Sequence, residues 1–174
     1  MPWPSLRRSL AVAAALWLLS MVAGFWLVSS MGRTVTPMPI PIPHGHAPIA
    51  PGDAFVGILA RNLAVYVGLL LGLATAGISA AALLCFNGIL FGRILAVAQL
   101  AGLATADIAR AVVPHAVLEL PGLLMGGGIG LLGFPLFCLW VKGRAPLRTV
   151  GRFDGPLARL ALLGVALLGV AAAI

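Results

Sequence analysis

The sequence contains very little charge. Charged residues make up 9% of the 174 residues, only 4 residues are acidic, and 61% are hydrophobic. Soluble globular proteins are roughly 45–50% apolar and about 25% charged. A soluble domain of this length could not cover so much apolar surface with so few charges. The composition therefore argues against a cytosolic enzyme, a nucleic-acid-binding protein and a disordered chain. The net charge of +7 does not change this, because the basic residues are scattered between apolar runs.

Cysteine and lysine are also scarce. Cys85 and Cys138 each lie inside an apolar run without the spacing of a zinc or redox motif, so we interpret both as small apolar residues of packed helices. Arginine outnumbers lysine ten to one, and alanine and glycine are abundant. This usage is typical of a G+C-rich genome and indicates a bacterium. His44 and His46 are too few ligands for a metal site, and we expect no metal or other cofactor.

Long charge-free runs predict an all-α fold, a polytopic membrane bundle of about five helices in a single domain. A helix needs about 20 apolar residues to cross a bilayer. The run between Arg61 and Arg93 is too long for one simple crossing, so we place a turn at Asn87-Gly88. The predicted helices cover residues 9–29, 63–86, 88–104, 114–141 and 157–174. A further short helix over residues 54–60, capped by Asp53, is expected to lie at the membrane interface.

The basic residues predict an orientation. Most of them flank the first helix or precede the last one: Arg7, Arg8, Lys142, Arg144, Arg148, Arg152 and Arg159. Basic segments face the cytoplasm, so the N-terminus is expected inside and the C-terminus outside. Residues 31–52 then form an external loop, and alternating prolines favour an extended polyproline II conformation there.

The first predicted helix has a second interpretation. Arg7 and Arg8 precede its apolar stretch and small residues follow it, as in a cleaved signal peptide. The apolar stretch, however, is longer than the usual 7–15 residues of such peptides. We therefore expect an uncleaved membrane anchor.

Small and polar residues mark where the helices should meet. Pairs of glycines four residues apart, such as Gly88 and Gly92, predict close packing of helix on helix. His115 and Glu119 share one face of a helix that is expected to begin near Pro114, and Pro121 should distort the following turn.

A carboxyl at this depth must face protein or a wet cavity. We expect Arg93 near the cytoplasmic end of its helix and Glu119 near the outer end of its own. The two are then too far apart for an ion pair, so Asn62 is a better partner for Glu119 than Arg93 or Asn87.

These residues resemble the stage II sporulation protein M family. Residues 114–122, PHAVLELPG, are similar to the family's PHG-x-x-E-L signature, with Ala116 where the family usually has glycine. Arg61-Asn62, Asn87-Gly88 and Gly92 support the resemblance, which covers about residues 54–141. The cluster that we single out is Asn62, Asn87, Gly88, Arg93, Pro114, His115, Glu119 and Pro121.

The resemblance implies an integral protein of the bacterial cytoplasmic membrane. In endospore formers the family member is a membrane subunit of a complex with two peptidoglycan-degrading enzymes and acts in engulfment. We therefore expect a scaffold or localising subunit and not an enzyme. Its expected partners are the lipid bilayer and either other membrane or cell-envelope proteins or further copies of itself. We expect no nucleic acid among them. Two alternatives stay open: a transporter or channel subunit, and a membrane subunit of a peptide-modifying enzyme complex that uses His115 and Glu119.

Overall fold

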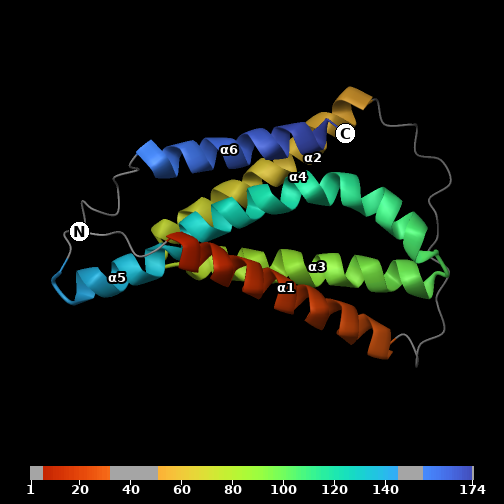
Figure 1. Ribbon diagram of the computed structural model, residues 1–174, viewed down its shortest axis with the longest axis horizontal. Helices are drawn as coiled ribbons and strands as arrows, with labels where there is room; N and C mark the ends of the chain where they lie inside the picture. The colour runs from red at the N-terminus through yellow and green to blue at the C-terminus, as the bar shows by residue number, and fades with distance from the viewer. Residues whose placement is uncertain (1–5, 32–50, 145–154, 174) are drawn as a thin grey trace.

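A computed structural model describes residues 6–31, 51–144 and 155–173 (Figure 1). The described residues form α1 (Leu6–Met31), α2 (Pro51–Leu70), a short 3₁₀ helix η1 (Leu71–Leu73), α3 (Ile78–Leu100), α4 (Thr105–Leu131), α5 (Gly133–Val141) and α6 (Gly155–Ala172). Five stretches of this part of the chain are long and apolar enough to cross a membrane, with α4 and α5 together forming one of them. The predicted all-helical fold and the number of spans are therefore confirmed.

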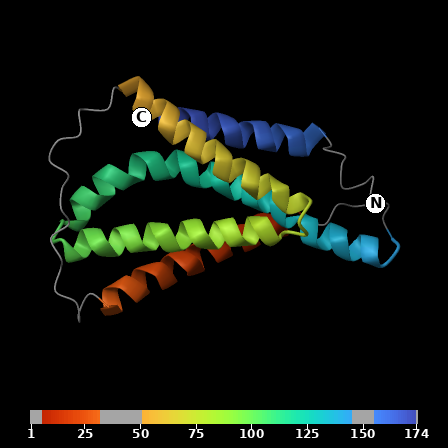
Figure 2. The ribbon, with the colours of Figure 1, turned by 180° about the vertical axis from the view of Figure 1, so that it is seen from behind.

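Successive spans run in opposite directions, as Figures 1 and 2 show. Leu10 near the start of α1 lies beside Gly128 near the end of α4. Leu157 at the start of α6 packs against the same end of α4, through Ile129. We call this end of the bundle the basic end. Its described basic residues, on α1, α6 and the end of α5, are Arg7, Arg8, Lys142, Arg144 and Arg159.

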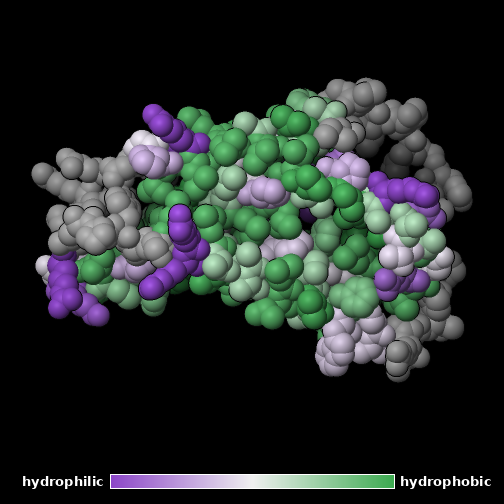
Figure 3. Space-filling view, in the orientation of Figure 1, coloured by the Kyte–Doolittle hydropathy of each residue, from purple (hydrophilic) through white to green (hydrophobic). Residues whose placement is uncertain are grey.

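The outer surface of the bundle is apolar. Figure 3 shows hydrophobic side chains along its length and hydrophilic ones toward its two ends. Leu19 of α1 and Ile78 of α3 are each 70% exposed, and Leu162 of α6 is 69% exposed. Such a surface is unfavourable in water and suits a bilayer. The protein is a multi-pass membrane protein whose helices contact lipid.

The chain reverses between α2 and α3 at a place that the sequence analysis did not predict. The predicted turn at Asn87-Gly88 is wrong, because both residues lie inside α3. The reversal occurs before Ile78, where Gly77 has a φ of 82° and donates its N–H to the Gly72 carbonyl at 2.7 Å. Glycine adopts this left-handed conformation without a steric penalty. The predicted separate helix over residues 54–60 is also wrong, since these residues belong to α2.

The fourth span begins earlier than predicted and is divided. The charge-free run predicts one helix at 114–141, but α4 begins at Thr105 and ends at Leu131, and α5 follows. Asp107 and Arg110, which fall between the predicted helices at 88–104 and 114–141, form an exposed ion pair of 3.0 Å in the first turns of α4. Pro114 and Pro121 therefore lie inside the helix. Each removes a backbone hydrogen bond, which accounts for the arch of α4 in Figure 1.

The other boundaries agree better with the sequence. The predicted helices at 9–29 and 157–174 correspond to α1 and α6. In the predicted external loop, residues 32–50 lie outside the described part of the chain, whereas Met31 ends α1 and residues 51 and 52 belong to α2. Cys85 and Cys138 are half-buried in α3 and α5 with free thiols.

Two packing arrangements hold the bundle together. Helices α1 and α3 approach so closely that a Cβ at Gly88 would lie 2.5 Å from the Trp17 carbonyl oxygen. Trp17 also packs on Phe91, with 5.3 Å between the ring centroids. In α4, successive glycines face three different helices, namely Gly126 toward α2, Gly127 toward α3 and Gly128 toward α1. The predicted close packing at glycines is confirmed, and it makes α4 the central helix of the bundle.

Candidate functional site: polar contacts between the helices

Glu119 of α4 is hydrogen-bonded to Asn62 of α2. The Asn62 Nδ2 donates to the Glu119 Oε1 at 2.8 Å, and both side chains are half-buried. This is the pairing that the sequence predicted. An amide donor stabilises a carboxyl oxygen inside an apolar bundle, where an unpaired polar group is costly. The contact joins two helices whose residues are 57 positions apart in the chain.

His115 lies one turn before Glu119 on α4 and is half-buried. Within the described part of the chain, the structure records no hydrogen bond to its imidazole. His115 and Glu119 share a helix face, as predicted from their spacing, but only Glu119 is engaged by α2.

Asn87 and Arg93 do not join this group. The Asn87 Nδ2 donates to the Leu83 carbonyl of its own helix at 2.8 Å. Arg93 is exposed and lies in the second half of α3, toward the end opposite the basic end. Its expected place near the cytoplasmic end of its helix, the end that carries the basic residues, is wrong, because α3 begins at Ile78 and Arg93 lies in its second half.

The prolines and the glycine of the predicted cluster act on the backbone. Pro114 and Pro121 bend α4, and Gly88 allows the backbones of α1 and α3 to approach. The predicted cluster therefore divides into one interhelical pair, one neighbouring histidine and residues with packing roles.

Tyr66 is a polar residue that the sequence analysis missed. It is 1% exposed, and its hydroxyl donates to the Ala161 carbonyl of α6 at 3.0 Å. Its ring lies against Gly126 of α4. Tyr66 is the single tyrosine of the chain and stands in an apolar run, a signal that could have identified it. A buried phenol normally hydrogen-bonds, so it predicts a partner on a neighbouring helix.

Hydroxyl groups fix the turn between α2 and α3. The Ser79 Oγ donates to the Gly68 carbonyl at 3.0 Å, which ties the start of α3 to the end of α2. The Thr75 Oγ1 accepts the Ser79 backbone N–H at 3.2 Å and so satisfies a free donor of the first turn of α3. These contacts stabilise the reversal that follows η1.

The polar side chains between the helices thus connect α2 to α3, α4 and α6. In the described residues, no three histidine, cysteine, aspartate or glutamate side chains gather as a metal site would require. A carboxyl held by an amide suits a structural connection, and a neighbouring imidazole adds a group that can exchange protons.

The chain is a polytopic membrane protein of the helix-bundle class, because it has five antiparallel spans, an apolar outer surface and interhelical hydrogen bonds. Within this class, the chain belongs to the stage II sporulation protein M family, whose model matches residues 13–174. Comparison with curated proteins and with solved structures gave no significant match.

Proposed function

We propose that this protein is a non-enzymatic scaffold of the bacterial cytoplasmic membrane that holds or localises other cell-envelope proteins. The observation that carries the proposal is the hydrogen bond between Asn62 and Glu119, because it uses the buried carboxyl of the family motif to join two helices. Tyr66 joins a third helix to the same part of the bundle. Close packing and interhelical hydrogen bonds make a stiff framework, which a protein that positions others requires.

The orientation is part of this proposal. Five of the described basic residues gather at the basic end, whereas Arg61, Arg93 and Arg110 lie elsewhere in the bundle, and Arg110 at the opposite end is paired with Asp107. The positive-inside rule then puts the basic end, and with it the N-terminus, in the cytoplasm. The segment between α1 and α2 and the C-terminal end of α6 then face the outside, the side of the cell-envelope partners.

The scaffold role is tested by removing the protein and following its partners. In a deletion strain, a fluorescently tagged cell-wall hydrolase that co-purifies with this protein should lose its localised signal while its amount stays constant. Wild-type protein and Glu119→Gln should both restore the signal, because glutamine keeps a hydrogen-bonding head group for Asn62. Unchanged localisation of the hydrolase in the deletion strain would contradict the scaffold role.

A second candidate is a proton-carrying subunit of a transporter. His115 favours it, because the imidazole lies one turn from Glu119 and is not hydrogen-bonded by any described residue. The same Glu119→Gln variant separates the two candidates. Normal protein amount with complete loss of function would support the transporter subunit, since glutamine cannot carry the proton.

A further inference from the structure

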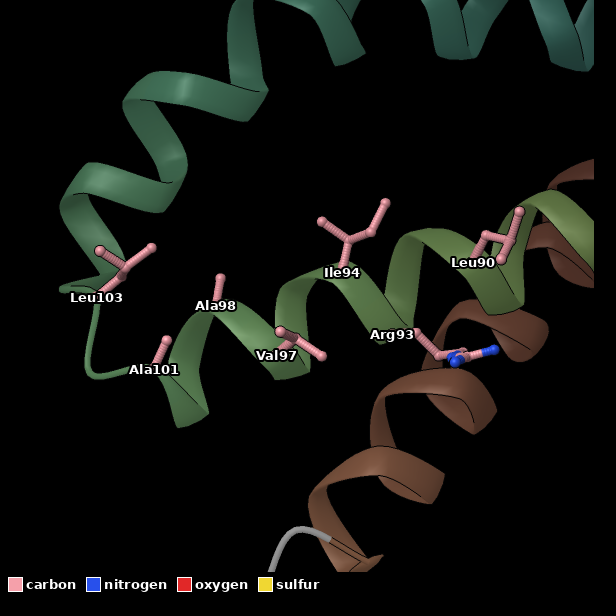
Figure 4. A pocket seen from close by; sticks show the side chains of 7 residues that line it. All are labelled: Leu90, Arg93, Ile94, Val97, Ala98, Ala101 and Leu103. Atoms are coloured by element: carbon pink, nitrogen blue, oxygen red, sulfur yellow. The ribbon is translucent and has the colours of Figure 1, made fainter. Parts of the chain in front are cut away.

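An apolar groove runs along the second half of α3 (Figure 4). Its volume is about 490 Å³, and its lining is apolar except for one arginine: Leu90, Arg93, Ile94, Val97, Ala98, Ala101 and Leu103. In Figure 4, α4 leads away from α3 after Leu103, so the arch of α4 leaves this face of α3 uncovered. Ile94 is 62% exposed.

Arg93 lies at a depth where a charge needs a partner. It stands about two helical turns before Leu100, in a helix about 35 Å long, against a hydrocarbon core of about 30 Å. Side chains of a helix lean toward its N-terminus, which for α3 is the direction of the bilayer centre. In Figure 4 the Arg93 side chain runs toward the level of Leu90, away from the nearer end of α3. The guanidinium is thus directed into the membrane.

Among the described residues, no carboxylate pairs with Arg93. Of the 4 acidic residues of the chain, Glu119 is bonded to Asn62 and Asp107 is paired with Arg110. Asp53 precedes the span that begins at Phe55, and Asp154 lies outside the described residues. In a second copy of the chain the described carboxylates inside the spans are engaged in the same way, so the expected partner is a different protein. Charged groups inside membranes pair with one another or face water.

We propose that Arg93 and the groove of α3 bind a transmembrane helix of a partner protein that carries an aspartate or glutamate at matching depth. An amphipathic or apolar helix fits a groove that follows a helix axis, and the carboxylate supplies the charge that Arg93 lacks. The inference rests on the proposed scaffold function and names the chemistry by which the scaffold recognises one partner.

Arg61 provides a matched control on the neighbouring helix. It is also exposed, and it stands about two turns inside the span that begins at Phe55. Because α2 runs opposite to α3, the same lean of side chains directs Arg61 toward the membrane surface, where lipid headgroups and water solvate it. Arg61→Gln removes a charge of equal depth but leaves the groove intact.

The test places a photo-crosslinking amino acid at Ile94 in the full-length protein, in living cells. One discrete protein adduct should form, and it should fall about tenfold in Arg93→Gln, the scale of one charge-assisted hydrogen bond. Arg93→Lys should keep part of the adduct and Arg61→Gln all of it. The same amino acid at Leu162 on α6, which is 69% exposed against 62% for Ile94, is the control for random contact. Equal amounts and melting temperatures of the variants exclude misfolding.

Sequencing the adduct decides the occupant. A transmembrane segment with an acidic residue, whose neutralisation also removes the adduct, supports the proposal. Two kinds of result would overturn it. The first is the wrong occupant: a second copy of this chain, lipid alone, or a partner without an intramembrane carboxylate. The second is an adduct that Arg93→Gln does not change, or no adduct at all.

A defined probe gives an independent measurement. The labelled purified protein is mixed in phosphatidylcholine vesicles with a polyleucine peptide of about 20 residues that contains one aspartate, and energy transfer is measured. The aspartate peptide should bind about tenfold better than its all-leucine counterpart, and Arg93→Gln should abolish the difference. Equal binding of both peptides would contradict the proposal. So would a change in binding that appears when phosphatidylglycerol is added to the vesicles but not when the aspartate is added to the peptide.

The outcomes distinguish the two proposals. If the hydrolase stays localised in the deletion strain but the Arg93-dependent adduct forms, the scaffold role for that hydrolase fails and the binding site stands. If localisation needs this protein but Arg93→Gln neither disturbs it nor changes the adduct, the binding site fails and the scaffold role stands.

Discussion

Tyr66 of α2 and Ala161 of α6 are joined across the bundle by a hydrogen bond of 3.0 Å from the phenol to the main-chain carbonyl. The ring between them packs on Gly126 of α4, where a Cβ would lie 2.6 Å from the ring carbon Cε2. One side chain therefore sets the spacing of three helices. Gly126 of α4 has no side chain and so makes room for the ring, and the hydrogen bond holds the hydroxyl end of the Tyr66 side chain in place.

The two parts of this contact are separable. Tyr66→Phe removes only the hydroxyl and should lower the unfolding free energy by about 0.6–1.5 kcal/mol, the range for one interhelical hydrogen bond. Tyr66→Ala also removes the ring from a buried position and should cost about 3–5 kcal/mol. Unfolding by dodecyl sulfate in mixed micelles measures both. Equal losses for the two variants would mean that the ring contributes no packing energy.

The pair of Asn62 and Glu119 should behave as a structural unit. Glu119→Ala leaves the Asn62 amide without its partner and should cost about 1–3 kcal/mol, whereas Glu119→Gln should be largely tolerated. In a double-mutant cycle, Asn62→Ala should add little to Glu119→Ala, because each removes the same hydrogen bond. Additive losses in detergent unfolding would show that the two side chains act independently.

The contact between α1 and α3 depends on the absence of side chains. A Cβ at Gly92 would overlap the Met21 carbonyl oxygen and lie 2.7 Å from the Phe25 nitrogen. Gly92→Ala should therefore separate the helices at a cost of about 1–3 kcal/mol. Gly169→Ala in α6 is the matched control, since a Cβ there meets nothing within 4 Å. It should be neutral or stabilise by up to about 1 kcal/mol through its higher helix propensity. A melting temperature that falls equally in both variants would argue against the close approach.

The sequence was sufficient for those features that depend on composition and spacing. The apolar runs, with the one between Arg61 and Arg93 counted as two crossings, predicted five spans, and the i, i+4 spacing of His115 and Glu119 put both on one face of a helix. The structure confirms Asn62 as the partner of Glu119, although Arg93 was excluded on a wrong premise, since it lies toward the end of the bundle opposite the basic end. The prediction of Asn62 is correct because a carboxyl in an apolar bundle has few acceptable neighbours.

The sequence was insufficient where one residue type serves two purposes. Asn87-Gly88 has the form of a turn, yet Gly88 packs against α1 and Asn87 bonds to its own helix. The actual reversal uses Gly77, whose positive φ cannot be recognised among 22 glycines. Pro114 resembled the start of a helix, but α4 continues through it as an arch. The conformation at these residues depends on packing against other helices, and a local sequence pattern carries no information about that packing.

The orientation of the chain is open to direct measurement. The basic end carries Arg7 and Arg8 at the start of α1 and Lys142 and Arg144 beyond α5, and such residues are retained in the cytoplasm. Alkaline phosphatase is active only outside the cytoplasmic membrane, whereas green fluorescent protein exported in unfolded form does not fluoresce. Phosphatase fused after Ile174 should therefore be active, and phosphatase fused after Arg144 should be inactive. Green fluorescent protein at the same two positions should give the reverse pattern. The paired positions control for expression, because α6 is the one described helix between them. A fluorescent, phosphatase-inactive fusion at Ile174 would place the C-terminus in the cytoplasm and contradict the proposed orientation.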